Sequence, residues 1–334
     1  MRDDGSARDV SRRTVVAGAA VMAAGSAAAQ TGQPGAARPS ERPMGPLVWL
    51  DMDQKALDDA YDQAVYAPNS EQVAKRRTVN SEAVRQRLGF KRVAYGSTPI
   101  EALDIFTTKA PNAPVMVFIH GGAWRAGSSK DNAEGAELFV NAGAHFVVLD
   151  FINVIEAGGS LFPMVEQIRR AVAWVYTNAK SFGGDPDRIY IAGRSSGSHL
   201  GGVVLITDWQ KDFGLPANLV KGALLSSGMY DLKPVRLSKR GAYVKFTDEM
   251  EEQLSTQRHL ARINCPVVLA HGTYETPEFQ RQTREFAAAL KAAGKPVTLL
   301  VGEGYNHFEI PETMASPYGL LGRAVLELMG LAKA

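Results

Sequence analysis

The sequence contains a single cysteine, Cys265, among its 334 residues. An intramolecular disulfide is therefore excluded, and so is a metal site built from several thiolates. No apolar run reaches the roughly 18 residues that a membrane span requires, so we expect no stable membrane anchor. The 37 basic and 35 acidic residues give a net charge of +2 and form no block of one sign. Without such a basic block, a nucleic-acid partner is not expected.

The composition is that of a globular protein. Hydrophobic residues make up 45% of the chain and charged residues 22%, which is enough apolar material for a large core and argues against a mainly disordered chain. The length would allow two domains, but α/β folds often use as many residues in one.

The first 29 residues have the three parts of an export signal. Arg12 and Arg13 precede a stretch of mostly small and apolar residues over positions 14–29, which ends in a small-x-small cleavage site at Ala27 and Ala29. The arginine pair is typical of a twin-arginine signal peptide, and the alternative is a flexible, alanine-rich N-terminus. We therefore expect an exported protein, periplasmic or secreted. Residues 30–46 hold four prolines and three glycines, a composition typical of a linker.

The remainder of the chain alternates between short apolar runs and longer helical patterns. Residues 47–89 show a broken apolar stripe at helical spacing and no strand signal, which predicts an N-terminal helical segment. Residues 90–95 and 102–107 predict an antiparallel hairpin, because only a Gly-Ser-Thr-Pro turn separates them. Six further runs suit strands buried on both faces: Val115–Ile119, Phe146–Leu149, Ile189–Ala192, Leu224–Leu225, Val267–Ala270 and Val297–Val301.

This alternation predicts an α/β fold for residues 90–334, with a mostly parallel central sheet flanked by helices. The polar and charged residues 231–260 interrupt the alternation after the sixth strand. We expect them to form an insertion or lid over the strand ends.

A G-x-S-x-G motif spans residues 193–197, between the strand at 189–192 and a helical run at 199–206. In that setting the serine lies on a strained strand-to-helix turn, and the glycines allow two backbones to approach closely. We predict that Ser195 is a nucleophile, and the alternative is a plain structural turn.

The segment His120-Gly-Gly-Ala-Trp124 ends the strand Val115–Ile119. Consecutive glycines at the end of a strand allow main-chain N–H groups to turn toward an anion. We expect the N–H groups of Gly122, Ala123 and Ser196 to form an oxyanion hole, against the alternative of a merely tight turn.

A serine nucleophile needs a base, and the base needs an orienting carboxylate. His307 directly follows the last predicted strand, where this architecture delivers a base to the top of the sheet. The other five histidines are expected in other roles: His120 as a brace of the oxyanion loop, His145 in packing, His199 inside a helix, His259 in the insertion and His271 one strand too early.

The acid should follow the preceding strand, which favours Glu275, with Glu278 in reserve. Four further carboxylates compete but belong to the polar insertion and are typical of a solvated helix face: Asp248, Glu249, Glu251 and Glu252. The sequence contains no metal-ligand motif and no glycine-rich phosphate loop, so we expect no metal and no cofactor.

Together these motifs resemble the α/β-hydrolase fold, in the esterase branch that includes the hormone-sensitive-lipase-like enzymes. More closely, the chain from about residue 47 onward is similar to the kynurenine formamidases (arylformamidases) and their bacterial carboxylesterase relatives. Further stretches that carry the resemblance are Tyr66–Asn69, Met164–Val175, Gly197–Leu200 and Ser227–Asp231.

The resemblance implies that Ser195 is the nucleophile, Glu275 the acid and His307 the base of a catalytic triad. Three residues depart from the family's pattern. Glu275 stands where Asp is usual, Arg194 where His is common, and Ser196 where Ala is frequent.

The activity that the resemblance implies is that of a serine carboxylesterase, which forms an acyl-enzyme on Ser195 with small or aromatic esters. An arylformamidase acting on N-formylkynurenine-like amides is the alternative, disfavoured by the export signal because tryptophan catabolism normally uses cytoplasmic metabolites. A non-catalytic binding protein is a remote third. From their places beside these loops, Trp124, Phe151, Phe162 and Phe308 are expected to contact the substrate, against the alternative of core packing.

Overall fold

The computed structural model describes residues 44–332. The predicted signal peptide at residues 1–29 lies outside the described residues, as does the predicted linker up to residue 43.

The N-terminal segment of the described chain begins with two short strands, β1 (Leu47–Trp49) and β2 (Met52–Asp53). The prediction that residues 47–89 contain no strand is therefore wrong. The two strands pair antiparallel around Leu50, whose φ is 49°, and they are too short for alternation to be visible in the sequence. The three helices that follow agree with the helical pattern: α1 (Gln54–Ala60), α2 (Gln63–Tyr66) and α3 (Ser70–Leu88).

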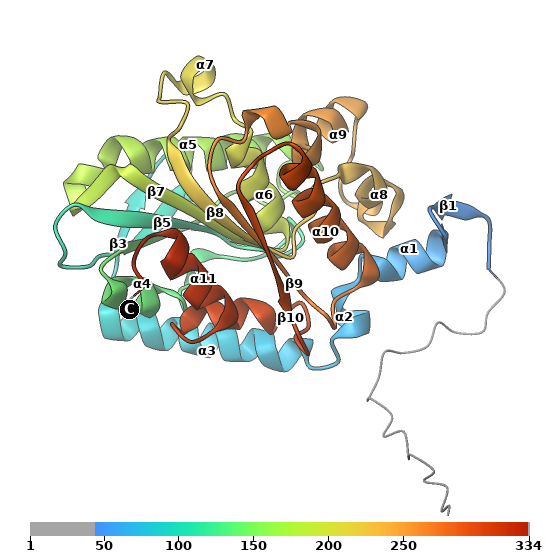
Figure 1. The fold of residues 1–334 in the computed structure, drawn as a ribbon, viewed down its shortest axis with the longest axis horizontal. Coiled ribbons are helices and arrows are strands. Elements are labelled where there is room, and N and C mark those ends of the chain that lie inside the picture. Colours follow the sequence, from blue (N-terminus) through green and yellow to red (C-terminus); the bar gives the residue numbers. More distant parts are fainter. Residues whose placement is uncertain (1–43, 333–334) are drawn as a thin grey trace, which may run out of the picture. The chain divides into compact units, whose positions relative to one another are not determined.

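An eight-stranded sheet forms the centre of the described chain, in the order β10-β9-β8-β7-β5-β6-β4-β3 (Figure 1). Its strands are β3 (Lys91–Ala94), β4 (Ala102–Phe106), β5 (Ala113–Ile119), β6 (His145–Leu149), β7 (Gly184–Arg194), β8 (Val220–Ser226), β9 (Val267–Gly272) and β10 (Val297–Gly302). The pairs β3–β4 and β4–β6 are antiparallel, and all other neighbours are parallel. The predicted hairpin and the mostly parallel sheet are thus confirmed.

Eight further helices connect or cover these strands: α4 (Ala136–Ala142), α5 (Phe162–Asn178), α6 (Ser196–Leu205), α7 (Trp209–Phe213), α8 (Leu232–Leu237), α9 (Asp248–Leu254), α10 (Pro277–Ala292) and α11 (Leu320–Leu328). Short 3-10 turns occur at Ser129–Asp131, Ala179–Phe182, Lys239–Ala242, Thr256–Arg258, Leu260–Arg262 and Ile310–Ala315. Residues 231–260 form α8, α9 and two of these turns, so the insertion is helical.

The sheet separates two apolar layers. Along β5, Val115, Val117 and Ile119 pack into the layer under α5, α6 and α10, whereas Met116 and Phe118 pack into the layer under α4 and α11. Figure 1 shows α5 and α6 on one side of the sheet and α3 and α11 on the other. Because alternate side chains of the strand point to opposite faces, a run that is apolar at every position suits this doubly covered sheet.

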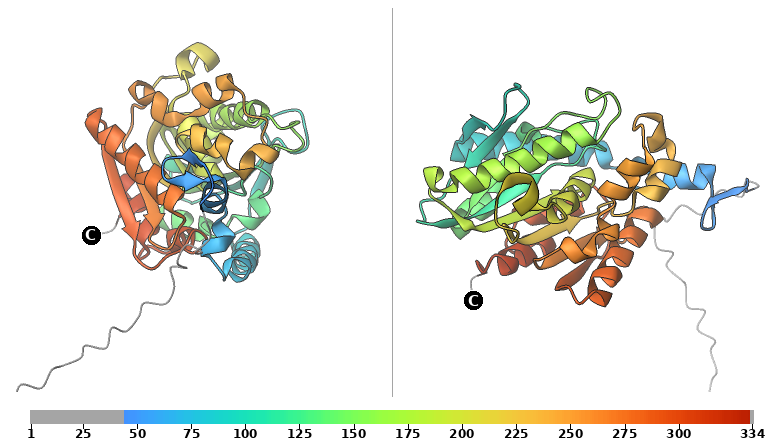
Figure 2. Two further views of the ribbon diagram at one scale, coloured as in Figure 1. Left: turned by 90° about the vertical axis from the view of Figure 1, so that its right-hand side faces the viewer. Right: turned by 90° about the horizontal axis from the view of Figure 1, so that it is seen from above.

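The two segments outside the alternating part meet each other. Figure 2 shows α1 beside α8, and Gln54 Nε2 of α1 donates to Leu237 O of α8 at 2.9 Å. In the turn that follows α8, Lys239 N donates to Asp58 Oδ1 of α1 at 2.6 Å. The insertion is thereby attached to the N-terminal helices.

Candidate active site

Ser195 occupies a sharp turn between β7 and α6. Its backbone has φ 55° and ψ −127°, a left-handed conformation that costs an L-residue free energy and recurs at functional sites. The turn needs glycine on both sides of the serine. A Cβ on Gly193 would lie 2.5 Å from Gly197 O, and a Cβ on Gly197 would lie 2.1 Å from Ile119 O. The G-x-S-x-G pattern thus reflects the crowding of the backbones beneath the serine.

Three side chains from separate strand ends form one hydrogen-bonded chain. His307 Nε2 lies 2.8 Å from Ser195 Oγ, and His307 Nδ1 lies 2.7 Å from Glu275 Oε2. Ser195 follows β7, Glu275 follows β9 and His307 follows β10. The parallel strands bring these ends to one edge of the sheet, so residues 112 positions apart in the sequence meet. All three are less than one-tenth exposed.

The second oxygen of Glu275 is held by two donors. Ser227 Oγ donates to Glu275 Oε1 at 2.6 Å, and the Gly272 N–H donates to the same atom at 2.7 Å. A buried carboxylate needs such donors because they replace the water it loses. Sequence reasoning assigned no role to Ser227. The signal that could have found it is its position directly after β8, on the edge where the other strand ends deliver their side chains.

The reserve acid and the competing carboxylates are engaged elsewhere. Glu278 accepts hydrogen bonds from Arg281 Nε at 2.6 Å and from the Tyr61 hydroxyl at 2.9 Å. In the insertion, Glu251 is bonded to Arg258 at 2.9 Å. It is only 8% exposed, so the expected solvated helix face is wrong for this carboxylate. Glu275 is thus the carboxylate that meets His307.

The loop after β5 presents main-chain N–H groups beside Ser195. Gly122, Ala123 and Trp124 have φ values of 129°, 55° and 61°. The Trp124 N–H donates to Ser196 Oγ at 3.2 Å, which ties this loop to the turn that carries the nucleophile. Ser196, which stands where alanine is frequent, therefore connects the oxyanion loop to the nucleophile turn, a role that the sequence pattern did not predict.

Three N–H groups on this loop and turn are free. The backbone N–H groups of Gly122, Ala123 and Ser196 donate to no acceptor within residues 44–332. Gly122 and Ala123 also line the same pocket as Ser195. Donors without partners beside a nucleophile are what an oxyanion hole requires.

The histidines outside the triad are mainly structural. His120 Nδ1 lies 2.9 Å from Gly121 O, and burial lowers its pKa to about 4. His199 Nδ1 lies 3.3 Å from Trp124 Nε1, and its Nε2 lies 3.1 Å from Leu254 O. Burial also lowers the pKa of His199 to about 4. Both rings are neutral at physiological pH and help to position the oxyanion loop.

Of the four aromatic residues predicted to contact substrate, one lines the pocket around Ser195 and three do not. Phe308 lines the pocket with Ser195, and Trp124, Phe151 and Phe162 do not. Trp124 is 2% exposed and packs edge-on against His199, and Phe151 stacks on His120 at 4.3 Å between ring centroids. Phe162 packs against the apolar layer under α5. For these three the structure shows core packing, which was the alternative to substrate contact. Adjacency in the chain does not set the direction of a side chain, and the left-handed loop turns the Trp124 indole into the core.

The pocket around Ser195 has a volume of about 500 Å³. Besides the strand-end loops, its walls come from α2 with its preceding residues, from α3, and from the turn after α8. Those walls include side chains that sequence reasoning did not single out: Tyr61, Asp62, Gln63, Arg77, Arg125, Lys239, Arg240 and Tyr243. Arg125 directly follows the motif His120–Trp124. The others come from segments without a recognisable pattern, so no short motif marks them.

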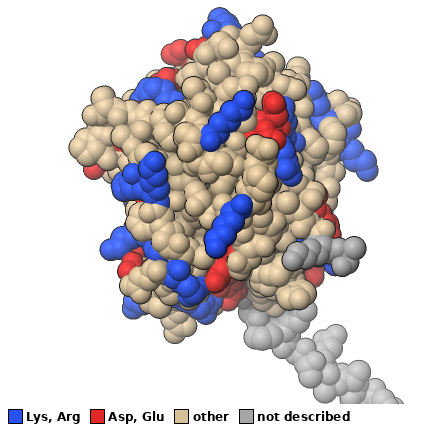
Figure 3. All heavy atoms as spheres, turned by 90° about the vertical axis from the view of Figure 1, so that its left-hand side faces the viewer, with Lys and Arg blue, Asp and Glu red and all other residues tan. Residues whose placement is uncertain are grey.

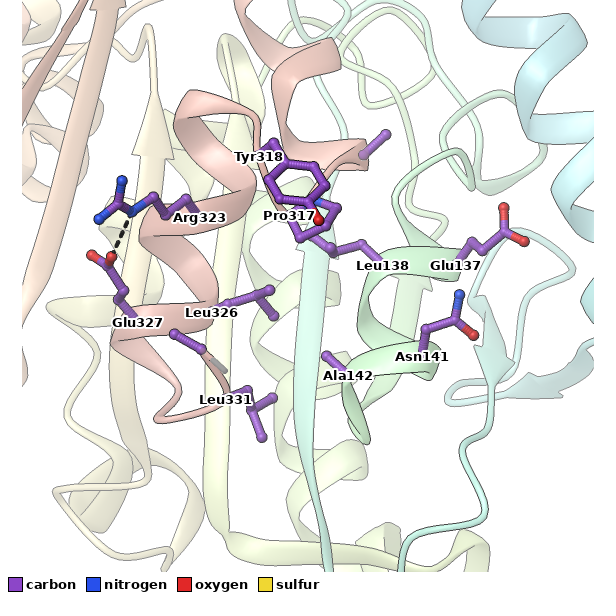
Figure 4. Close-up of a pocket in the computed structure, with 12 residues that line it drawn as sticks. Glu137, Leu138, Asn141, Ala142, Pro317, Tyr318, Arg323, Leu326, Glu327 and Leu331 are labelled. Atoms are coloured by element: carbon purple, nitrogen blue, oxygen red, sulfur yellow. Dashed lines mark hydrogen bonds and ion pairs between the residues drawn. The ribbon is translucent and has the colours of Figure 1, made fainter. Parts of the chain in front are cut away.

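A second hollow, of about 700 Å³, lies between α4 and the C-terminal segment (Figure 4). It shares no lining residue with the Ser195 pocket. Its charged side chains pair with partners of opposite sign, since Arg323 bonds Glu327 at 2.9 Å and Glu137 bonds Arg87. Among the residues that line it there is no nucleophile next to a base, so the chemistry belongs to the smaller pocket.

Residues 44–332 contain no group of three or more His, Cys, Asp or Glu side chains arranged to hold a metal ion. None of the helices in that same range combines the length and the hydropathy that crossing a bilayer demands.

Comparison with known proteins agrees with this geometry. A family model described as BD-FAE matches residues 103–227, a range that holds the oxyanion loop and the nucleophile turn. A kynurenine formamidase of Danio rerio is 29% identical over 84% of this chain and 98% of its own. A probable isoprenylcysteine alpha-carbonyl methylesterase of Oryza sativa subsp. japonica is 28% identical over 66% of this chain and 58% of its own.

Solved structures show the same fold. Esterase B from Lactobacillus rhamnosis, in a crystal structure with a tributyrin phosphonate, superposes with a TM-score of 0.66 at 17% identity, over 84% of this chain and 96% of its own. The sheet order, the strand-end loops and these relatives agree with one another. The chain is a serine hydrolase with the α/β-hydrolase fold, of the type that acts on esters or amides.

Proposed function

We propose that the protein is a carboxylesterase that works through an acyl-enzyme on Ser195. The observation that supports this best is the hydrogen-bonded chain from Ser195 through His307 to Glu275. It lies next to three main-chain N–H groups that have no acceptor among residues 44–332. Ser195 attacks the ester carbonyl while His307 takes its proton. The N–H groups of Gly122, Ala123 and Ser196 stabilise the oxyanion.

The second half of the reaction uses the same groups. His307 gives its proton to the leaving alcohol, then activates the water that releases the acid from Ser195. Glu275 orients the imidazole and stabilises its cation. No cofactor enters this scheme, and the substrate is a small molecule that fits a pocket of about 500 Å³.

The experiment compares Ser195→Ala with the wild type on short p-nitrophenyl esters. We expect kcat/KM to fall by roughly 10³ or more, as for other serine hydrolases that lose the nucleophile. The matched control is Ser198→Ala, whose hydroxyl is one turn further along α6 and donates to Ser226 O. Equal activity of Ser195→Ala and the wild type would refute the proposal.

The second candidate is an arylformamidase. It is favoured by the relative from Danio rerio, named as a kynurenine formamidase, since the alignment covers 98% of that protein. The same catalytic groups can cleave a formamide, because the tetrahedral intermediate again carries an oxyanion. The ratio of kcat/KM for N-formylkynurenine to that for a p-nitrophenyl ester separates the two candidates, since an arylformamidase would favour the amide.

Export through the twin-arginine route is also proposed, and it rests on Arg12, Arg13 and the apolar stretch that follows. Fusion of residues 1–46 to a reporter enzyme tests it. We expect the reporter outside the cytoplasm, and retention after replacing both arginines by lysine. A reporter that stays in the cytoplasm with the native segment would contradict the proposal.

A further inference from the structure

The pocket around Ser195 has an unequal charge distribution. Five basic side chains line it and only one acidic side chain does. The basic residues are Arg77, Arg125, Arg194, Lys239 and Arg240, and the acid is Asp62. The chain as a whole is nearly balanced, with a net charge of +2. On the face shown in Figure 3, Lys and Arg are scattered and interspersed with Asp and Glu.

Most of these cations form no ion pair with any residue that the structure describes. Asp62 forms its ion pair with Lys239, so it neutralises one of the five. The Arg194 guanidinium donates to the neutral amide oxygen of Asn132 at 3.0 and 3.2 Å and forms no ion pair in the described part of the chain. Arg77, Arg125 and Arg240 form no ion pair within residues 44–332. Arginines elsewhere in the molecule do pair: Arg76 with Glu312, Arg85 with Asp104 and Arg281 with Glu278.

The pocket wall also collects unpartnered polar atoms. Nine buried side-chain nitrogen or oxygen atoms in the described range have no hydrogen-bond partner, and four of them belong to residues that line this pocket. They are Arg77 Nε, Arg240 Nε and both amide atoms of Gln63. Buried polar groups are normally bonded, so these four point to hydrogen bonds that a ligand completes after a small adjustment of the wall.

The Arg240 guanidinium is positioned by aromatic rings and a backbone carbonyl, not by an ion pair with a described residue. Arg240 is 5% exposed and its guanidinium lies 5.6 to 5.8 Å from the ring centres of Tyr61, Trp124 and Phe279. Its Nη2 donates to Tyr61 O at 3.2 Å. Ring faces, the Tyr61 carbonyl and the Tyr243 hydroxyl at 3.5 Å fix the position of this charge. The carboxylate of Asp62 is near enough for the charge of Arg240 to help lower its pKa, but within residues 44–332 it forms its ion pair with Lys239 and none with Arg240. A buried cation without a counterion costs folding free energy, which a bound anion recovers.

Burial and neighbouring charges both act on the Arg194 guanidinium. Burial, followed by the positive charge of Arg77, lowers the pKa of Arg194 to about 9. The nearby carboxyl of Glu134 is itself buried, and its pKa is raised by that burial. The charges of Arg194 and Arg77 lower the pKa of Glu134 in the opposite direction, so this one carboxyl faces two of the five cations.

We propose that the natural substrate carries a free carboxylate, which Arg77 and Arg240 bind while Ser195 attacks its ester or amide carbonyl. Both arginines line the same pocket of about 500 Å³ as Ser195 and His307, so the carboxylate lies within a few bonds of the scissile group. A guanidinium is suited to this task because its planar donors match a carboxylate. This inference rests on the proposed hydrolysis at Ser195 and narrows its substrate class.

The test uses two esters of equal shape and different charge. One is the mono-p-nitrophenyl ester of glutaric acid, and the other is p-nitrophenyl 4-carbamoylbutanoate, in which a neutral amide replaces the carboxylate. We expect wild-type kcat/KM to be at least tenfold higher for the anionic ester. In Arg77→Gln and Arg240→Gln the ratio between the two esters should fall at least tenfold, chiefly through KM.

Two further variants sharpen the result. Arg76→Gln is the matched control, because Arg76 precedes Arg77 on α3 but pairs with Glu312 outside the pocket, and its ratio should equal that of the wild type. Arg240→Lys keeps the charge and should retain part of the ratio. If Arg240→Gln fails to fold, the ratio measured for Arg77→Gln still tests the proposal, because Arg77 is only half-buried. A wild-type ratio of one or less, or ratios unchanged in both glutamine variants, would overturn the proposal.

A binding measurement separates this inference from the proposed hydrolysis. Calorimetric titration of glutarate into the Ser195→Ala protein needs no catalysis. We expect saturable binding that weakens at least tenfold when Arg77→Gln is added. If hydrolysis persists in Ser195→Ala but glutarate binds in this way, the proposed mechanism fails and the carboxylate site stands. If glutarate does not bind and the wild-type kcat/KM ratio between the two esters is one, the carboxylate site is refuted and the proposed hydrolysis is unaffected.

Discussion

Ser227 donates its hydroxyl hydrogen bond to Glu275 Oε1 at 2.6 Å, on the oxygen opposite to the one that meets His307. Ser227 has a φ of 56° at the end of β8, so this strand delivers a donor to the acid that follows β9. The acid is thereby held by the protein on one side and by the base on the other.

Removing this donor should lower the rate without changing substrate affinity. In Ser227→Ala, Glu275 keeps only the Gly272 N–H on that oxygen. A hydrogen bond to a charged group contributes about 1.5 to 3 kcal/mol, so we expect kcat to fall roughly tenfold with KM unchanged. The neighbouring Ser226→Ala is the control, because the Ser226 hydroxyl lies 3.3 Å from the Ser227 hydroxyl and forms no hydrogen bond with Glu275 in the described residues. A lower melting temperature with normal kcat would show that Ser227 serves stability instead.

Glu275 should be sensitive to both charge and length. In Glu275→Gln the amide can donate to His307 Nδ1, which leaves the imidazole proton on the wrong nitrogen, and kcat should fall by about 10³ to 10⁴. Glu275→Asp keeps the charge but withdraws it by one methylene from His307, Ser227 and Gly272. We therefore expect a smaller loss, and single-turnover acylation rates of the two variants measure the difference. A loss in the aspartate variant as large as in the glutamine variant would mean that length, not charge, dominates.

The oxyanion loop should tolerate no side chain at Gly122. Its φ is 129°, and a Cβ there would lie 2.0 Å from Ala126 O. Gly122→Ala should displace the loop and lower kcat by about 10² to 10³, the cost of losing an oxyanion donor, while the fold persists. Gly158→Ala is the control, because Gly158 also has a positive φ, of 68°, but a Cβ on it would meet no atom within 4 Å. Circular dichroism and p-nitrophenyl ester kinetics distinguish the two variants.

Buried neutral histidines make folding stability depend on pH. His199 accepts from the Trp124 indole N–H, which only donates, so its ring carries its proton on Nε2 toward Leu254 O. Burial lowers its folded pKa to about 4, whereas an unfolded histidine has a pKa of about 6.5. Between those values the unfolded chain binds a proton that the folded chain does not. Stability should therefore fall as the pH drops from about 6.5 to about 4, by up to roughly 1.4 kcal/mol per pH unit for this residue.

Urea unfolding at pH 4.5, 5.5 and 6.5 measures this dependence. The slope of unfolding free energy against pH should be smaller in His199→Gln than in the wild type, although the variant is less stable at each pH. His120, whose pKa burial also lowers to about 4, adds a parallel contribution that both proteins share. Identical slopes would show that His199 is not the group that titrates.

The strands and the catalytic groups were largely predictable from the sequence. Most strands of the sheet are apolar runs, and Ser195, Glu275 and His307 each follow such a run, so the parallel topology alone brings them to one edge. The pair β1 and β2 was not predictable, because strands of three and two residues carry no periodic signal.

The pocket was less predictable than the catalytic chain. Tyr61, Gln63 and Arg240 reach it from segments whose packing depends on contacts across nearly 180 residues, such as Arg240 with Tyr61 O. The direction of Trp124 depends on left-handed backbone at Ala123 and Trp124 itself, a conformation that is uncommon for residues other than glycine and that no motif announces. Long-range packing and local backbone strain are therefore the two determinants of the pocket that the residue pattern does not predict.

The contact of the N-terminal helices with the insertion, through Gln54, Asp58 and Lys239, has an evolutionary consequence. The catalytic side chains lie at strand ends. Many of the side chains that line the pocket instead lie on the N-terminal helices and the insertion, which are hydrogen-bonded to each other. Replacing these two segments together would change the substrate specificity and leave the catalytic residues in place. Related enzymes can therefore diverge in substrate while they keep the same reaction.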